Sequence, residues 1–398
     1  MLVSEATEIY ILGGARTPFG TYGGSLKDVN ATELGVVAAK AAMERVGVPA
    51  SAVDLAIVGN VIATAPDAAY TARHIALGAG LDETAPALTV NRLCGSGLQA
   101  VISAAQALAL GDGMSALAGG TENMSQAPYL IRDARWGIKS GAPAMTDSLL
   151  EVLTDLGCGL GMGMTAENLA MQYDIRRETQ DAYAALSHQR AHAARAAGRL
   201  SREIVAVSVP TKRGVVQVEE DEHIRPQTSP ESLARLKPSF KAEAGTVTAG
   251  NASGINDGAA MVVLATGDFV TTHGIKPLGR IVSYGVAGVD PKIMGIGPVP
   301  ASKIALERAR LDIGDIGLVE INEAFASQYL AVEQELGLVR DRTNVNGGAI
   351  ALGHPVGASG GRLLLTLALE LQMRHLQFGL ASLCIGGGQG IAIIIESL

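Results

Sequence analysis

Apolar runs of two lengths alternate in the first part of the chain, and they predict strands and helices in turn. The run IYILGG, which begins at Ile9, is short and ends in two glycines, which predicts a buried strand leaving a sheet. Over Glu33–Val46 apolar residues recur at helical spacing, with Thr32 as the predicted N-cap and Gly47 as the stop. The run DLAIVGNV over 54–61 predicts another buried strand. This alternation predicts a parallel α/β sheet with helices on both faces.

The same pattern returns near the C-terminus, with a predicted helix over Ser302–Arg310 and a predicted strand over Ile316–Asn322. The segment that ends at Asn60 aligns without a gap with the segment that ends at Asn322. About the same offset superposes CGSGLQAVISAAQAL, from Cys94, on GASGGRLLLTLALEL, from Gly357, and each helix leads to a strand with terminal glycines. We interpret this as an internal duplication, with chance similarity of two strand–helix units as the alternative.

Three regions follow from this interpretation. One half is built from residues 1–124 and is completed by about 256–274, and the other half is built from 275–398. Between them, 125–255 carries most of the charge and proline, and it is predicted to be an inserted loop domain with helices over Thr165–Tyr173 and Glu178–Ala197. Long irregular insertions on rigid scaffolds usually bind a ligand. The alternative is that this insertion is a dispensable surface segment.

Composition and charge exclude several classes of partner. Of 398 residues 48% are hydrophobic, so the chain can bury a large core. The net charge is −8 with both signs interspersed, which argues against nucleic acid and anionic membranes as partners. The N-terminal residues lack the basic start and apolar core of a secretion signal, and we expect no stretch with the roughly 18 uncharged apolar residues of a membrane span. The expected location is therefore cytoplasmic.

The cysteines point to reduced thiols. The chain has three, Cys94, Cys158 and Cys384, without C-x-x-C spacing. An odd number of cysteines argues against a disulfide framework, and the lack of C-x-x-C spacing argues against a structural zinc site, so no metal is expected.

Cys94 is the first candidate for chemistry. It lies in NRLCGSG, after the apolar run Leu88–Val90 and directly before an apolar helix. A thiol at a helix N-terminus feels the positive end of the helix dipole, which is expected to favour the thiolate and to raise its nucleophilicity. An inert buried cysteine is the alternative for this segment taken alone.

Three further polar residues lie at glycine-rich loops or strand ends. His354, in NVNGGAIALGHPVGASGG, offers an imidazole suited to take a proton from a cysteine near neutral pH. Cys384, in SLCIGGGQG, ends the last predicted strand unit, and strand ends are where open α/β sheets place ligands. Asn322, in EINEAF, can hold a water or donate to an oxyanion. A satisfied core histidine, a spectator cysteine and an amide that ties a loop remain the alternatives.

Six segments together resemble one family, the thiolases, over nearly the whole chain. They are NRLCGSG, GGTENMSQAPY, TAGNASGINDGAA, NEAF, GGAIALGHPVGASG and CIGGGQG, in the order and at the spacings of that family. The resemblance implies a thiolase-like duplicated α-β-α-β-α architecture of five layers with an inserted loop domain. It also implies acyl transfer between coenzyme A and a 3-ketoacyl-CoA, either as condensation of two acetyl-CoA molecules or as thiolytic cleavage.

The resemblance implies a role for each candidate. Cys94 would be the nucleophile that carries the acyl group, His354 the base that activates it, and Cys384 the group that performs the second proton transfer. One oxyanion hole would use His354 and a water held by Asn322, and the other the backbone N–H groups of Cys94 and Gly386. No metal or redox cofactor enters this chemistry, and coenzyme A thioesters are the substrates.

Coenzyme A is implied to lie across the inserted loop domain. By resemblance Ser253 would contact the pantetheine arm and Arg225 would lie near the nucleotide end. Met162, Met294 and Phe325 would line the pantetheine tunnel or the acyl pocket, although each could be ordinary core. The family also implies a homotetramer, a dimer of dimers.

One departure concerns substrate length. Short-chain acetoacetyl-CoA thiolases typically carry His-Met-Gly before the T-A-E-N helix, whereas this chain has GMGMTAEN with Gly161 in the histidine position. Loss of that side chain is expected to open the region around the acyl group, and the chain-length preference stays open. A decarboxylating 3-ketoacyl synthase is disfavoured because the last polar member is Cys384 rather than a second histidine. A non-catalytic acyl-CoA-binding protein is disfavoured because all four polar groups are retained.

Overall fold

The N-terminal half builds a mixed sheet, not the parallel one expected. In this computed structural model, which describes residues 7–398, the strand order is β4-β3-β5-β12-β1. Strand β3 runs parallel to β4 and β5, whereas β12 runs antiparallel to both β5 and β1. The chain leaves the C-terminal end of β5 into the long insertion and returns to the sheet at that same end of the neighbouring position. Strand β12 therefore runs in the opposite direction to β5. The strands are β1 (Ile9–Arg16), β3 (Leu55–Gly59), β4 (Ala87–Val90), β5 (Ser115–Asn123) and β12 (Asn256–Thr266), with β2 (Gly20–Thr21) paired to β12.

The C-terminal half repeats this pairing. Its strand order is β14-β15-β16-β13, in which β14 is parallel to β15 and the other pairs are antiparallel. A parallel bridge between Val319 and Thr343 occupies the place that β4 takes in the other half. This repetition supports our proposal of a duplication with halves at 1–124 and 275–398. The strands are β13 (Gly279–Gly288), β14 (Leu318–Ile321), β15 (Phe378–Ile385) and β16 (Gln389–Ser397).

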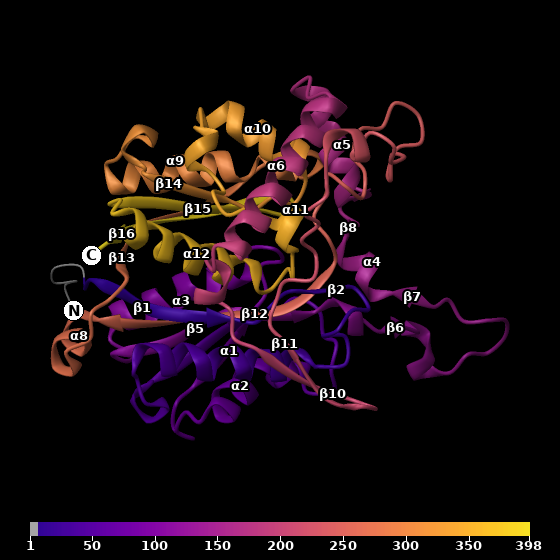
Figure 1. Cartoon of the computed structure of the whole chain (residues 1–398). Coiled ribbons are helices and arrows are strands. Elements are labelled where there is room, and N and C mark those ends of the chain that lie inside the picture. The colour runs from indigo at the N-terminus through magenta and orange to yellow at the C-terminus, as the bar shows by residue number, and fades with distance from the viewer. Residues whose placement is uncertain (1–6) are drawn as a thin grey trace.

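The two sheets join along a short seam. Strand β1 pairs with β13 only at Tyr10 with Arg280 and Ile11 with Gly279, which makes one hydrogen-bonded sheet of 10 strands. On either side of the seam the sheets lie in separate layers (Figure 1).

Helices form three layers around the sheets, so the expected five-layer α-β-α-β-α architecture is confirmed (Figure 1). One outer layer holds α1 and α2, the layer between the sheets holds α3 and α12, and the other outer layer holds α9 and α10. Their bounds are α1 (Ala31–Val46), α2 (Thr71–Ala79), α3 (Ser96–Leu110), α9 (Pro298–Ala309), α10 (Ala326–Leu336) and α12 (Ser359–Arg374).

Helix α1 begins earlier than expected. Its N-cap is Asn30, not Thr32, because the Asn30 side chain accepts the N–H of Glu33 at 2.8 Å while the Glu33 carboxylate accepts the N–H of Asn30 at 3.1 Å. This reciprocal capping box satisfies two donors at the helix start. Gly47 ends the helix in the left-handed conformation, with φ 68°, as predicted.

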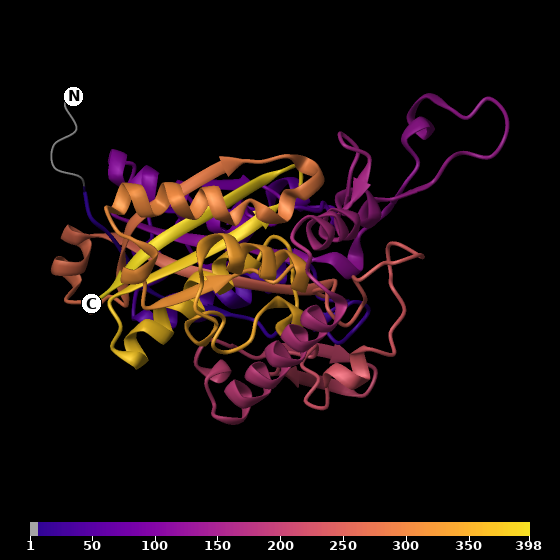
Figure 2. The same ribbon diagram turned by 90° about the horizontal axis from the view of Figure 1, so that it is seen from above.

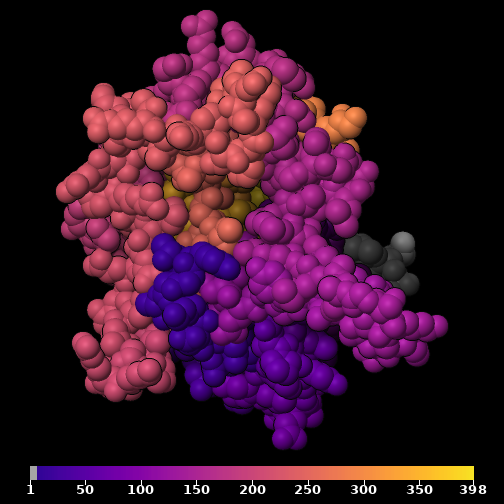
Figure 3. Space-filling model, turned by 90° about the vertical axis from the view of Figure 1, so that its right-hand side faces the viewer, coloured from indigo at the N-terminus to yellow at the C-terminus, as the bar shows by residue number. Residues whose placement is uncertain are grey.

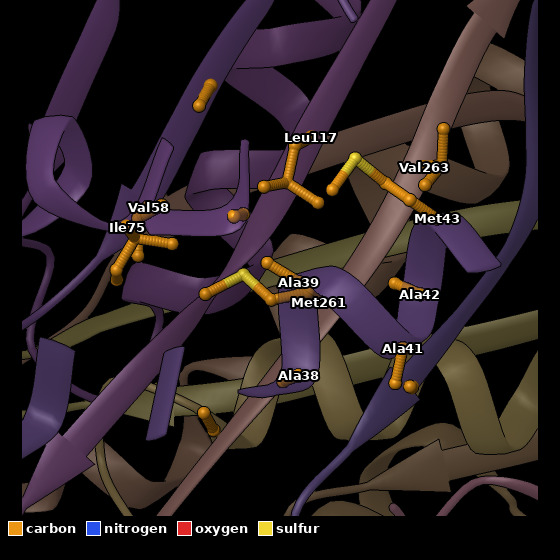
Figure 4. Close-up of a cluster of buried hydrophobic side chains, with 14 of the residues drawn as sticks. Ala38, Ala39, Ala41, Ala42, Met43, Val58, Ile75, Leu117, Met261 and Val263 are labelled. Carbon is orange, nitrogen blue, oxygen red and sulfur yellow. The ribbon is translucent and has the colours of Figure 1, made fainter. Parts of the chain in front are cut away.

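Small residues let α1 approach the sheet of the N-terminal half, the lower sheet in Figure 1, closely. Figure 4 shows Ala38, Ala39, Ala41 and Ala42 of α1 among larger side chains from the strands and from α2. Close packing of this kind gives each buried methyl or methylene many dispersion contacts and fixes the layer spacing.

The central helices touch through glycine. A Cβ at Gly97 of α3 would lie 2.7 Å from the carbonyl oxygen of Gly357, and a Cβ at Gly360 of α12 would collide with the backbone nitrogen of Leu98. The first turns of α3 and α12 therefore lie backbone against backbone. This contact positions the two loops that precede these helices next to each other.

One sequence expectation about apolar length is wrong. The window Leu93–Leu110 is long and apolar enough to cross a membrane by length and composition. In the structure this window contains α3, and half of it is buried inside the protein, where α3 packs on β3, β5 and α12. A helix enclosed between two sheets needs this composition for its core contacts.

The inserted segment lies at one end of the layers (Figures 1 and 2). A long excursion between β6 and β7 extends away from the body, and the β10–β11 hairpin lies beside the lower sheet. Shorter elements elsewhere include α8 after β12 and α11 before α12. The bounds are β6 (Tyr129–Leu130), β7 (Thr146–Asp147), α4 (Ser148–Val152), β8 (Thr154–Asp155), β9 (Leu160–Gly161), α5 (Met162–Gln172), α6 (Arg177–Ala196), β10 (Val207–Thr211), β11 (Gly214–Val218), α7 (Pro230–Leu233), α8 (Gly267–His273) and α11 (Ala349–Leu352).

Candidate active site

Cys94 lies in the tight turn between β4 and α3. The preceding residue, Leu93, has φ 47°, a conformation that side-chain-bearing residues seldom adopt. Ser96 fastens the turn, since its hydroxyl accepts the N–H of Arg92 at 2.8 Å and donates to the carbonyl of Leu93 at 2.7 Å. The turn therefore fixes the half-buried thiol at the entrance to the helix.

The thiol of Cys94 is not acidic at rest. The pKa of Cys94 is raised to about 11, chiefly by burial and in smaller part by Glu122, while the N–H groups of Gly386 and of Cys94 itself act to lower it. The expectation that the helix N-terminus would favour the thiolate is therefore wrong, because the loss of hydration outweighs the nearby N–H dipoles. Cys94 needs a base to become a nucleophile.

Cys384 is the second thiol of the site. It is the penultimate residue of β15 and is fully buried. The Cys94 turn lies against this strand end, since a Cβ at Gly95 would lie 2.6 Å from Cδ1 of Ile385. Burial raises the pKa of Cys384 strongly, and Cys94 also acts to raise it. Gly386, two residues later, directs its N–H toward Cys94.

His354 is held on three sides. Its backbone N–H donates to Oδ1 of Asn256 at 3.0 Å, and its Nδ1 lies 2.6 Å from Oγ of Ser359. The Ser359 hydroxyl donates to the carbonyl of Pro355 at 3.0 Å, so it can only accept from the imidazole. Nδ1 therefore carries the proton, and Nε2 presents a lone pair.

Asn322 lies next to this lone pair. Its Nδ2 is 3.3 Å from Nε2 of His354, and its backbone N–H donates to the carbonyl of Ser382 at 2.9 Å. Among residues 7–398 the buried Oδ1 of Asn322 has no hydrogen-bond partner. Burial, together with the positive Arg362, lowers the pKa of His354 to about 3, so the imidazole is neutral at neutral pH.

The structure brings Cys94, Cys384, Asn322, His354 and Gly386 to one place. The glycine contact between α3 and α12 sets the Cys94 turn beside the His354 loop, and Val356 of that loop packs in the same apolar cluster as Cys94. Asn322 bridges from His354 to β15, which carries Cys384. Both halves of the chain contribute, as the sequence predicted from distant segments.

An apolar cluster of buried side chains adjoins Cys384. Met162, Met294 and Phe325 pack with Cys384 in one cluster, and the Met162 sulfur would lie 3.3 Å from a Cβ at Gly386. Met294 lies in the short helical turn Pro291–Ile296. These three residues are therefore both buried core and neighbours of the reacting groups, so the two alternatives for them are compatible.

Ser253 and Arg225, two of the residues predicted to contact coenzyme A, lie in different surroundings. The N–H of Ser253 donates to the carbonyl of Ala324 at 2.9 Å, which puts Ser253 beside the Asn322 loop. Arg225 is exposed, and its backbone N–H donates to Nδ1 of His188 at 3.1 Å. Figure 3 shows a hollow on this side of the molecule, bordered by segments of the insertion and by the N-terminal segment, with C-terminal residues at its floor.

Sequence reasoning missed three residues that hold the site: Ser359, Asn256 and Glu122. All three lie inside the recognised segments, Ser359 in GHPVGASG, Asn256 in TAGNASGINDGAA and Glu122 in GGTENMSQAPY. The spacing from His354 to Ser359, at a helix start, was the one signal available in sequence. Within residues 7–398 no group of three His, Cys, Asp or Glu side chains is placed to hold a metal ion.

Comparison with known proteins agrees with this arrangement. Residues 9–268 match the family model "Thiolase, N-terminal domain", and residues 275–397 match "Thiolase, C-terminal domain". The mitochondrial 3-ketoacyl-CoA thiolase of Homo sapiens is 52% identical over 390 residues, 98% of each chain. An acetyl-CoA acetyltransferase of Cupriavidus necator is 49% identical over 392 residues, 98% of this chain and 99% of the relative. The crystal structure of human mitochondrial 3-ketoacyl-CoA thiolase in complex with CoA superposes with a TM-score of 0.95 at 50% identity, covering 99% of this chain and 98% of that one.

Proposed function

The chain belongs to the thiolase family, and from this premise we propose that it transfers acyl groups between coenzyme A and 3-ketoacyl-CoA through a thioester on Cys94. The observation that carries the proposal is the close approach of the Cys94 turn to the end of β15, which carries Cys384. A Cβ at Gly95 would lie 2.6 Å from Cδ1 of Ile385, and a Cβ at Gly386 would lie 3.2 Å from Cδ1 of Leu93. A neutral imidazole lies on the neighbouring loop, with its proton on Nδ1 and its unprotonated Nε2 3.3 Å from Nδ2 of Asn322.

In thiolysis, His354 Nε2 takes the proton of Cys94, and the thiolate attacks the 3-keto carbon of the substrate. The bond between C2 and C3 breaks, and the thiol of Cys384 protonates the departing acetyl-CoA carbanion. The products of this step are acetyl-CoA, acyl-Cys94, a protonated His354 and a Cys384 thiolate.

Free coenzyme A completes the cycle. Its thiol gives a proton to the Cys384 thiolate and attacks the acyl carbon on Cys94. The Cys94 thiolate leaves and recovers its proton from His354, so both groups return to their starting states. In condensation the same steps run backwards, with Cys384 as the base that removes a proton from the α-carbon of acetyl-CoA.

Two sets of donors support the negative oxygens that develop. The N–H groups of Cys94 and Gly386, which point at the Cys94 sulfur, are placed for the oxygen of the acyl-Cys94 adduct. The unpartnered Oδ1 of Asn322 is suited to hold a water that donates, with His354, to the enolate oxygen. Donors fixed before reaction stabilise this charge without reorganisation.

Coenzyme A thioesters are proposed as the only cosubstrates, with no separate cofactor. A relative was crystallised with CoA, and in this chain Ser253, Arg225, Met162, Met294 and Phe325 are the proposed contacts. Ser253 and Phe325 support this assignment because they lie together at the loop after Asn322, where Ala252 pairs with Phe325 and the N–H of Ser253 donates to the carbonyl of Ala324.

The experiment that tests the proposal is intact-protein mass spectrometry after mixing with acetyl-CoA or acetoacetyl-CoA. Wild-type protein should gain one acetyl group, and peptide mapping should assign it to Cys94. The variant Cys94→Ala should gain none, whereas the matched control Cys158→Ala should label as wild type. Binding of coenzyme A without any label on Cys94 would refute the enzyme and favour a non-catalytic binding protein.

Substrate range is tested separately, since relatives carry both 3-ketoacyl-CoA thiolase and acetyl-CoA acetyltransferase names. Thiolysis of acetoacetyl-CoA and of 3-ketooctanoyl-CoA should be compared under identical conditions. Cleavage of only the four-carbon substrate would assign a short-chain role, and comparable cleavage of both would assign a broad range.

A homotetramer and a cytoplasmic location are also proposed. The excursion between β6 and β7 carries Trp136, 86% exposed, and Met145, 62% exposed, and apolar side chains on a projecting loop favour contact with another copy of the chain. The cytoplasmic location rests on the free thiols and on the charge pattern, whereas the first relative is named mitochondrial.

A further inference from the structure

Glu122 is a buried carboxylate that the reaction described above does not use. It is the penultimate residue of β5 and is fully buried. Oε1 accepts Nδ2 of Asn60 and the N–H of Ile62, both at 3.1 Å. Oε2 accepts the N–H groups of Val61 and Gly357, both at 3.0 Å.

These donors come from the two segments that enclose Cys94. Val61 and Ile62 follow β3, and Gly357 follows the His354 loop. Ile62 and Val356 are members of the apolar cluster in which Cys94 packs. The carboxylate of Glu122 thus fastens both walls of the Cys94 environment to the end of one strand, across the boundary between the halves of the chain.

We propose that Glu122 is a positioning residue for acyl transfer, whose carboxylate joins the loop that carries His354 to residues 60–62, the segment after β3 that packs beside Cys94. The proposal rests on the assignment of Cys94 and His354 as nucleophile and base. Three acceptors divide this loop between them, with Glu323 accepting the N–H of Ile350 at 3.1 Å, Asn256 that of His354 at 3.0 Å and Glu122 that of Gly357 at 3.0 Å. Glu122 and Asn256 lie in the N-terminal sheet, on β5 and β12, and of the three acceptors only Glu122 also binds the segment after β3 that packs beside Cys94.

Gly357 shows how tight this contact is. A Cβ at this position would lie 2.7 Å from Oε2 of Glu122 and 2.5 Å from the carbonyl oxygen of Thr121. Any side chain would push the loop away from the carboxylate, so the contact requires glycine at 357.

The charge of Glu122 has a second effect. Both oxygens accept two N–H donors each, which favours the ionised form, whereas burial and the nearby Asp257 raise the pKa of Glu122 to about 8. The carboxylate is therefore ionised over the alkaline range in which the Cys94 thiol titrates. Besides burial, the groups that act on the pKa of the Cys94 thiol are Glu122 of β5 and the N–H groups of Gly386 and of Cys94 itself, and Cys94 in turn acts on Cys384 of β15. His354, on the loop before α12, is the proposed base. Where Glu122 is ionised, its negative charge raises the pKa of the Cys94 thiol in addition to the effect of burial.

The test is the pH dependence of Cys94 alkylation by iodoacetamide, resolved from Cys158 and Cys384 by peptide mass spectrometry, together with steady-state thiolysis of acetoacetyl-CoA. In Glu122→Gln the alkylation midpoint should fall by about one pH unit, because a neighbouring negative charge is removed. Its kcat should fall at least about tenfold, because the new NH2 group opposes two N–H donors. In Glu122→Asp the midpoint should stay at the wild-type value while kcat falls, because the charge is kept but the reach to Gly357 is shorter.

The matched control is Glu323→Gln. Glu323 is equally buried and also accepts four donors, from Tyr183, Ser187, Asn344 and Ile350, but it is not among the charges that act on the Cys94 thiol. Its alkylation midpoint should match wild type.

A Glu122→Gln midpoint equal to that of wild type, or an unchanged kcat in Glu122→Asp, would overturn the proposal. If Glu122→Gln does not fold, two measurements still decide. The wild-type midpoint should lie above the roughly 8.5 of an ordinary cysteine, and Glu122→Asp should lose kcat with KM within about twofold of wild type. A wild-type midpoint below 8.5 would also overturn the proposal. Loss of acyl-Cys94 labelling in the wild type would instead refute the proposed function itself.

Discussion

Nδ1 of His354 lies 2.6 Å from Oγ of Ser359, and this contact decides which imidazole nitrogen is free. The Ser359 hydroxyl donates its proton to the carbonyl of Pro355 at 3.0 Å, so its oxygen accepts a hydrogen bond from Nδ1 of His354. The lone pair at Nε2 is thereby aimed toward Asn322 and the site. A serine five residues after the base thus sets the tautomer on which proton removal depends.

Replacement of Ser359 by alanine should slow acylation of Cys94 about tenfold or more, because the tautomer with a free Nε2 loses its acceptor at Nδ1. The rate is measured by rapid quench with acetoacetyl-CoA. Ser302→Ala is the control, since Ser302 is also a fully buried helix serine and its Oγ has no partner among residues 7–398. An acylation rate in Ser359→Ala equal to that of the control would contradict the assignment.

Introducing a histidine at Gly161 should narrow the acyl region. A Cβ there meets only Leu153 at 3.8 Å and Thr154 at 4.0 Å, so the backbone accepts a side chain, and the next residue, Met162, borders Gly386. Gly161→His should lower kcat/KM for 3-ketooctanoyl-CoA at least about tenfold relative to acetoacetyl-CoA. Gly161→Ala should leave the ratio unchanged, and an equal loss on both substrates in the histidine variant would show that Gly161 does not control length.

Acid should destabilise the fold through His188. Burial lowers the pKa of His188 to about 4, helped by His223 and Arg225. The unfolded chain therefore takes up this proton first, and stability is lost as pH falls from about 6.5 toward 4. His188→Gln should reduce the loss in unfolding free energy between pH 6.5 and 5.0 by roughly 1 to 2 kcal/mol, measured by urea denaturation.

The control for this effect lies on the same helix. His192 is exposed on α6, and His192→Gln should keep the wild-type pH dependence. A His188→Gln variant with the wild-type slope would show that acid acts through other groups.

Assembly should depend on Trp136. The indole is 86% exposed on the excursion between β6 and β7, so Trp136→Ser should shift the protein from tetramer toward dimer in sedimentation velocity runs. Met171→Ser, at a 73% exposed apolar position on α5, should not. A wild-type monomer, or a tetramer that survives the Trp136 change, would count against the proposed contact.

The sequence predicted the layered fold and the central residues because both leave local marks. Glycine-rich turns before apolar helices reveal Cys94 and His354, and the repeated strand–helix units reveal two halves. The sheet direction was wrong because the 125–255 insertion hides the return of β12, which no local periodicity encodes. The N-cap was misplaced because Asn30 and Thr32 are both capable caps, and only the reach of Glu33 distinguishes them.

Two features could not be predicted from the sequence: the hydrogen-bond partners that lie far apart along the chain, and the burial of individual side chains. Asn256 holds the backbone of His354 from 98 residues away, and Glu122 holds Gly357 from 235 residues away. The acidity of Cys94 was misjudged for a related reason. A helix start is visible in sequence, whereas the loss of water around the thiol is a property of the packed chain.

Because α3 and α12 touch through glycine, catalytic activity should depend closely on how the two halves of the chain pack against each other. Cys94, the proposed nucleophile, precedes α3, and His354, the proposed base, precedes α12. The two helices touch through backbone atoms, with no side chain between them to accommodate a displacement. A slip of about an ångström at this contact would part the reacting groups while both cores stayed packed. On warming, activity should therefore fade before circular dichroism changes, and during refolding it should be the last property to return.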